Sequence, residues 1–101
     1  MRTPGVTTAA EARHLARVAA LGCVLCELQG YGSETPAEVH HVRGDAANVG
    51  GAQRASHYLT MPLCPTCHRG PTGVHGDRWL LKKCKTTELG MLALTIEKLQ
   101  K

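Results

Sequence analysis

Residues 62–68 of the chain read Pro-Leu-Cys-Pro-Thr-Cys-His, and residues 23–26 read Cys-Val-Leu-Cys. Each segment holds a Cys-x-x-Cys pair, a spacing that bends the backbone so that two thiolates face one ion. Two such pairs supply the four tetrahedral sulfur ligands that a structural zinc ion prefers. The sequence therefore predicts a zinc site made by Cys23, Cys26, Cys64 and Cys67.

The composition of the chain favours such a site. The chain has 101 residues with no Phe, one Trp and two Tyr, so we expect one domain over residues 1–101 with a marginal hydrophobic core. It shows no N-terminal apolar run of the kind found in signal peptides and membrane spans. We therefore expect a cytoplasmic protein without membrane association, where paired cysteines more often hold metal than form disulfides. The fifth cysteine, Cys84, is expected to be a buried free thiol.

Local patterns predict an α+β domain with a helix at each end. Residues 1–7 are expected to form a flexible leader, and the capping-box spacing of Thr8 and Glu11 predicts a helix over residues 8–21. Extended segments are then predicted over residues 38–43 and 58–63, and a helix over residues 77–84. Thr86 or Thr87 begins a last helix, which is expected to pack against the first one. The apolar face expected for that last helix consists of Leu89, Leu92, Ala93, Ile96 and Leu99.

Histidines are concentrated between the first cysteine pair and residue 75, where five of the six lie: His40, His41, His57, His68 and His75. Hydrolysis of a phosphodiester needs a base that works near neutral pH, which suits histidine. It also needs a cation that neutralises charge on the phosphate. This concentration indicates a nuclease-type site.

The positions of these histidines favour that interpretation. His40 and His41 point to opposite faces of a strand, so one can bind a metal while its neighbour faces the substrate as a base. His68 follows the second cysteine pair, so the zinc fixes its backbone, and His75 can close the metal site from the following loop. The alternative is that these histidines only face solvent or donate hydrogen bonds, which suits a lone histidine better than this group.

The order Cys-x-x-Cys, Glu-Val-His-His-Val, Pro-Leu-Cys-x-x-Cys-His resembles the HNH endonucleases that carry a four-cysteine zinc site. The resemblance implies a ββα-metal (His-Me finger) fold, His41 as general base, and His40, His68 and His75 as ligands of one catalytic divalent metal (Mg²⁺, Mn²⁺ or Zn²⁺). His57 falls where the family has its middle Asn, a residue that orients the loop or the base.

The blocks 37–41, 53–60, 62–64 and 68–76, with the tail from Thr87 to Ile96, are similar to the RecA-dependent recombination-enhancement nucleases of temperate phages. This resemblance implies a double-strand DNA endonuclease directed by a RecA filament in the host cytoplasm. It leaves the oligomeric state open. Residues 70–73, Gly-Pro-Thr-Gly, interrupt the helix expected after His68 and are expected to shorten or displace the helix of the ββα unit.

The chain carries a formal charge of +4, a modest excess that fits DNA as the partner. Phosphate contacts are expected from Arg43, Arg54, Arg69, Arg78 and Lys82. For the cations near residue 80 the alternative is a solvated helix face. The competing function is a zinc-knuckle module that binds DNA or protein without catalysis; a thiol redox protein is disfavoured because no βαβ pattern surrounds either cysteine pair.

Overall fold

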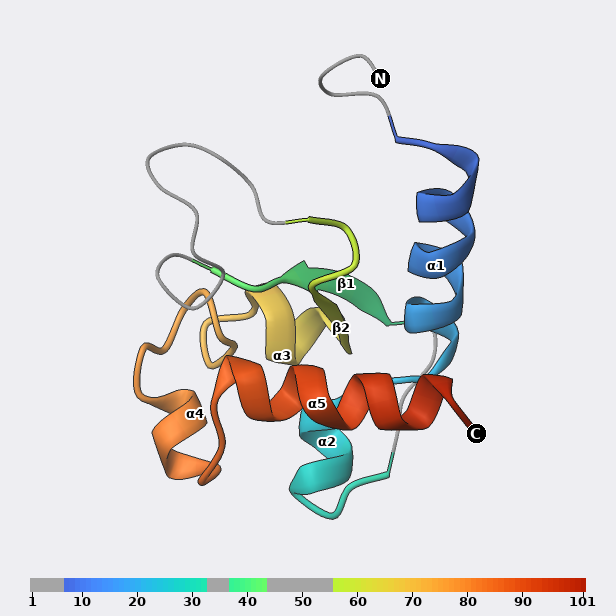
Figure 1. Cartoon of the computed structure of the whole chain (residues 1–101). Coiled ribbons are helices and arrows are strands. Elements are labelled where there is room, and N and C mark those ends of the chain that lie inside the picture. The colour runs from blue at the N-terminus through green and yellow to red at the C-terminus, as the bar shows by residue number, and fades with distance from the viewer. Residues whose placement is uncertain (1–6, 33–36, 44–55) are drawn as a thin grey trace.

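A computed structural model describes residues 7–32, 37–43 and 56–101 and has an α+β architecture (Figure 1). Within these residues five helices surround one two-stranded sheet. The elements are α1 (Ala9–Ala20), α2 (Val24–Leu28), β1 (Glu38–His41), β2 (Thr60–Leu63), α3 (Pro65–Arg69), α4 (Leu80–Lys83) and α5 (Glu88–Leu99).

Helix α1 has the predicted start and end within one residue. The Thr8 hydroxyl accepts the backbone N–H of Glu11, and the Glu11 carboxylate accepts the backbone N–H of Thr8, which completes the capping box. Gly22 adopts a φ of 81°, a left-handed conformation that ends the helix at little cost because glycine lacks a Cβ. The predicted leader lies outside the described residues except for Thr7.

The sheet is an antiparallel pair that places His40 opposite Met61 and His41 opposite Thr60. The predicted extended segments were slightly too long, since pairing within the sheet is confined to residues 38–41 and 60–63. One further hydrogen bond, from the Val42 N–H to the Leu59 carbonyl at 2.9 Å, extends the contact beyond β1. Every residue of β2 is buried, so β2 lies in the middle of the fold.

The core is aliphatic and sulfur-rich. Its buried members come from α2, β2, α5, the cysteine pairs, the residue after β1 and the loop after α3: Cys23, Val24, Leu25, Val42, Met61, Leu63, Cys64, Val74, Met91 and Leu92. Helix α5 crosses beneath the sheet and packs against β2, α2 and α1 (Figure 1).

The prediction for the buried face of α5 was wrong, because the helix is rotated about its axis relative to the predicted orientation. Leu89 and Ile96 are 52% and 44% exposed, whereas the buried residues are Glu88, Met91, Leu92 and Thr95. These positions share one face of a helix. Glu88 fixes the rotation because its carboxylate is bound to β1, and the Thr95 hydroxyl is satisfied by the Met91 carbonyl at 2.8 Å.

The helix predicted over residues 77–84 is shorter than expected. Only Leu80–Lys83 is helical, because Asp77 closes a turn by accepting the Trp79 N–H at 2.9 Å. Cys84 is half-buried, packs against the core and remains a free thiol outside the four-cysteine cluster.

Candidate metal centres and nuclease site

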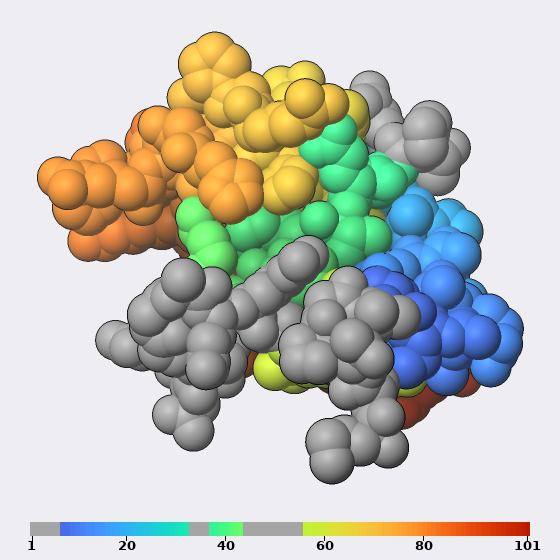
Figure 2. All heavy atoms as spheres, turned by 90° about the horizontal axis from the view of Figure 1, so that it is seen from above, coloured from blue at the N-terminus to red at the C-terminus, as the bar shows by residue number. Residues whose placement is uncertain are grey.

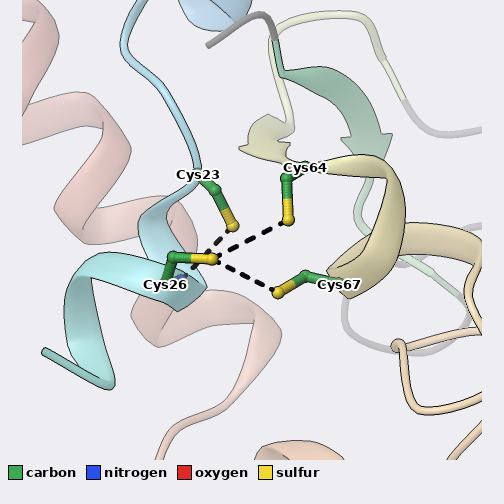
Figure 3. A group of neighbouring side chains, drawn as sticks. All are labelled: Cys23, Cys26, Cys64 and Cys67. Carbon is green, nitrogen blue, oxygen red and sulfur yellow. Dashed lines mark hydrogen bonds between the residues drawn. The ribbon is translucent and has the colours of Figure 1, made fainter. Parts of the chain in front are cut away.

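The four cysteines of the two Cys-x-x-Cys pairs converge on one point (Figure 3). Cys23 and Cys64 are the N-cap residues of α2 and α3, so the short helices place Cys26 and Cys67 beside them. The Cys26 sulfur lies 3.7 Å from those of Cys64 and Cys67. A tetrahedral zinc with bonds of about 2.3 Å separates its sulfurs by about 3.8 Å, so this donor set fits a structural metal such as zinc.

The pKa shifts of these thiols also fit a site that holds a cation. Burial and the neighbouring thiols raise the pKa of Cys26 to about 12 and that of Cys67 well above its usual range. Burial opposes ionisation of Cys64 as well, but hydrogen bonds from the Cys67 backbone and the nearby thiols outweigh it and lower its pKa. Four thiolates at such separations require a positive ion between them.

Three histidines form a second cluster of potential ligands. His40 comes from β1, His68 from α3 and His75 from the loop after α3, and one potential ligand atom from each lies within 4.8 Å of the others. His40 is buried, His68 half-buried and His75 exposed. The cluster therefore faces solvent on one side, an arrangement that leaves room for a substrate.

The loop that carries His75 is packed tightly onto α3. The N–H groups of Val74 and His75 donate to the carbonyls of Cys67 and His68 at 2.7 and 3.2 Å. A Cβ on Gly73 would lie 2.6 Å from the Thr66 carbonyl oxygen, so only glycine allows this approach. The predicted interruption after His68 is confirmed, and it folds His75 back toward His68.

A carboxylate supports two of the three imidazoles. His40 Nε2 lies 2.9 Å from Glu88, and His68 Nδ1 lies 2.9 Å from Glu38. Hydrogen bonds from Arg69 and His68 lower the pKa of Glu38, so the carboxylate is ionised and accepts the proton of His68. The opposite nitrogen of each ring is then left as the one that can bind a metal, the usual arrangement of metal-ligating histidines.

Glu88 connects α5 to the strand that carries the histidines. One carboxylate oxygen accepts the Arg43 backbone N–H at 2.7 Å, and the other accepts both the Arg43 guanidinium and His40. Burial raises the pKa of Glu88, but these hydrogen bonds outweigh it and lower the pKa to about 2. Glu88 is therefore ionised at neutral pH, and His40 Nε2 carries the shared hydrogen.

His75 is held in its neutral form, which is the form that binds metal. Partial burial lowers its pKa, a proton on the neighbouring His40 or His68 and the charge of Arg43 act in the same direction, and Glu88 opposes them.

His41 lies next to His40 on β1 and contacts a different partner. Its Nε2 lies 3.0 Å from Nδ1 of His57, and the two rings meet edge to face with centroids 5.1 Å apart. The Thr7 hydroxyl lies 3.4 Å from Nε2 of His57. The structure thus brings together the two histidines for which the sequence suggested catalytic roles.

Comparison with known proteins places the chain in a family. A family model described as "Recombination enhancement, RecA-dependent nuclease" matches residues 7–90, a range that contains both clusters. The chain belongs to this RecA-dependent nuclease family. The family description is that of an enzyme, a nuclease of recombination. Searches of curated proteins and of solved structures returned no match for this family member.

The cations predicted to bind DNA occupy different environments in this family member. Arg43 is half-exposed and binds Glu88 and the Val74 carbonyl, so its guanidinium has a structural role that the prediction missed. Arg69 is 68% exposed and pairs with Glu38. Arg78 and Lys82 are exposed beside Trp79, and Arg54 lies outside the described residues.

No helix in the described part of the chain is long and apolar enough to cross a membrane.

Glu38 and Glu88 are the site residues that the sequence analysis missed. Glu38 lies two positions before His40 on the same strand, and alternation along a strand gave a signal for it. Glu88 lies 48 residues from His40, and no local pattern connects the two.

Proposed function

We propose that this family member is an HNH-type, metal-dependent DNA endonuclease built as one ββα-metal domain over residues 1–101. The observation that carries the proposal is the cluster of His40, His68 and His75, two of whose rings are backed by carboxylates. A merely structural histidine cluster has no need of one open side and of two ionised carboxylates behind it.

His40, His68 and His75 would hold one divalent ion, Mg²⁺, Mn²⁺ or Zn²⁺. When bound, such an ion neutralises charge on the phosphate and on the leaving oxygen. Glu88 and Glu38 fix the orientation of two of the rings. The open side near His75 is where a phosphate would approach.

His41 is the general base in this proposal. With His41 donating its Nε2 hydrogen to His57 Nδ1, the other ring nitrogen of His41, Nδ1, is unprotonated and accepts a proton from water near neutral pH. After that transfer Nε2 still donates to His57 Nδ1, so His57 stabilises the resulting imidazolium without changing its own tautomer. His57 thus takes the place of the Asn that the HNH pattern has at this position.

The four-cysteine cluster has a supporting role. A zinc ion bound by Cys23, Cys26, Cys64 and Cys67 would join α2 to the start of α3. His68 follows Cys67 directly, so the zinc would fix one ligand of the catalytic metal.

The proposed substrate is DNA, with the RecA filament as the partner that directs cleavage in the host cytoplasm. Arg43, Arg54, Arg69, Arg78 and Lys82 remain the proposed phosphate contacts, with Arg43 contributing only through the exposed part of its side chain. We found no base-reading helix pattern, so we expect cleavage with little sequence preference.

The test is nicking of supercoiled plasmid by the zinc-loaded chain with Mg²⁺ or Mn²⁺, each with and without a RecA filament. We expect the native chain to cut and His41→Ala to lose cleavage while keeping its zinc and circular dichroism spectrum. His14→Gln is the matched control, because His14 lies on α1 outside both clusters. Cleavage by His41→Ala at the native rate would contradict the assigned base.

Metal content provides a second test. A nuclease should hold one tightly bound zinc per chain and a second, exchangeable ion that is lost in a His40→Ala, His68→Ala double variant. A native chain that holds only the tight zinc and never cuts DNA would instead support the non-catalytic zinc-knuckle module.

A further inference from the structure

The three aromatic residues of the chain all lie on its surface. Tyr31, Tyr58 and Trp79 are 77%, 47% and 51% exposed, while the core is filled by aliphatic and sulfur-containing side chains. An exposed indole forgoes the free energy of burying a large apolar side chain. A surface position for the only Trp of a core-poor chain therefore indicates a contact with a partner.

Two cations lie over the indole ring of Trp79. The guanidinium carbon of Arg78 lies 4.9 Å from the centroid of the indole, and Nζ of Lys82 lies 5.9 Å from it. Both cations are exposed. An aromatic ring with two positive charges over it is a combination that binds a nucleobase and the phosphate next to it, with the cations moving from the ring to the phosphate when the base stacks.

The position of Trp79 is fixed by Asp77. Its carboxylate accepts the Trp79 N–H at 2.9 Å and the Lys83 ammonium at 2.8 Å, and its own N–H donates to the Gly73 carbonyl at 2.8 Å. These bonds join the start of α4 to the loop that carries His75. Figure 2 shows the orange segment around α4 projecting from the body of the molecule.

Trp79 is close to the proposed catalytic cluster along the chain. Four peptide steps of about 3.8 Å separate His75 from Trp79, so their Cα atoms lie within about 15 Å of each other. Successive phosphates of a strand rise about 3.4 Å per nucleotide in a duplex. A strand bound at the histidines can therefore reach Trp79 within about four nucleotides.

We propose that Trp79, with Arg78 and Lys82, is a stacking site for an unpaired base of the DNA strand bound at the histidine cluster. The inference rests on the proposed nuclease function and extends it by naming single-stranded DNA next to the cleavage point as a recognised feature. Bases in an intact duplex are stacked on one another and offer no face to the indole. The site therefore favours unpaired strands over duplex.

Trp79 is the only Trp in the chain, so its fluorescence reports directly on this site. We would titrate the full-length, zinc-loaded His41→Ala protein with oligothymidylate and with a hairpin duplex of equal charge. Oligothymidylate should quench the emission at lower concentration than the duplex. Equal quenching by the two, or none by oligothymidylate, would overturn the proposal.

Substitution at residue 79 tests the energetics. In the same His41→Ala background, Trp79→Leu should weaken binding of labelled oligothymidylate by roughly 5-fold to 150-fold, which corresponds to about 1–3 kcal/mol for one stacked base. Trp79→Phe should retain most of the affinity, and duplex binding should change less than about 2-fold. Tyr31→Leu is the matched control, because it removes an aromatic ring that is even more exposed.

Three outcomes separate the possibilities. If Trp79→Leu binds oligothymidylate as tightly as the parent, or Tyr31→Leu weakens binding equally, the stacking site is refuted. If duplex and single strands lose affinity equally, the residue acts without base stacking, and the proposal is again refuted. If stacking is observed but the native chain never cleaves DNA, the nuclease proposal fails while the stacking site stands.

Discussion

Replacing Glu88 by Gln changes one atom of the carboxylate that joins α5 to the histidine strand. The native oxygens accept hydrogen bonds from His40, the Arg43 backbone and the Arg43 guanidinium. A Gln amide offers one oxygen and one NH₂ group, so at least one of these N–H groups loses its acceptor whichever way the amide is turned.

The expected cost follows from the burial of each partner. A buried donor left without an acceptor costs about 1–3 kcal/mol. The Arg43 side chain is 45% exposed, so the lost ion pair with it adds only about 0–1 kcal/mol. Together these contributions come to roughly 1–4 kcal/mol, which lowers the melting temperature of a domain of this size by roughly 4–8 °C for each kcal/mol.

Thermal unfolding of the zinc-loaded protein, followed by circular dichroism, measures this loss. Glu97→Gln is the control, since the same change on the same helix affects an exposed residue 3.8 Å from Lys101. We expect it to shift the melting temperature by no more than about 3 °C, because exposed ion pairs contribute little. If Glu88→Gln is as stable as Glu97→Gln, the assignment of Glu88 as the buried anchor of β1 is incorrect.

Three further predictions concern the clusters and pH. Cys67→Ser should lose its zinc and unfold, whereas Cys84→Ser should keep one zinc per chain by mass spectrometry; zinc retention by Cys67→Ser would argue against the site. Glu38→Gln should weaken Mn²⁺ binding about 10-fold to 100-fold in calorimetric titration, and an unchanged affinity would remove Glu38 from the support of His68. Burial and the charge of Arg17 lower the pKa of His14 in the folded chain. The imidazole of the unfolded chain therefore binds a proton more readily than that of the folded chain, and the stability of the fold decreases as the pH drops through 6.5. In urea unfolding between about pH 8 and about pH 5, His14→Gln should therefore lose less unfolding free energy than the native chain. Equal losses in the two proteins would refute this effect of His14.

Features that depend on short sequence spacing could be predicted. The two Cys-x-x-Cys pairs needed only their own spacing to indicate a common ion, and the capping pair at Thr8 and Glu11 located α1 within one residue. The adjacent His40 and His41 were expected to face opposite ways, and the structure buries His40 while leaving His41 half-buried.

Features that depend on distant partners could not be predicted. The rotation of α5 follows from the bond between Glu88 and His40, and the apolar residues alone favoured a face that included Leu89 and Ile96. Arg43 was expected to meet phosphate because it follows the histidines, but Glu88 lies within reach only after α5 packs under the sheet. Each error has the same physical cause, which is an ion pair between segments more than 40 residues apart.

Helix α3 carries Cys67 and His68 side by side, so one turn of backbone is shared by the two proposed metal centres. An ion that orders this turn from one side reduces the entropy still to be lost when an ion binds on the other side. Thermodynamic linkage makes this effect reciprocal, so each metal should raise the affinity for the other by the same factor. A cell that depletes the structural ion would therefore also weaken the catalytic one, and zinc supply would set the fraction of the enzyme that is competent to cut.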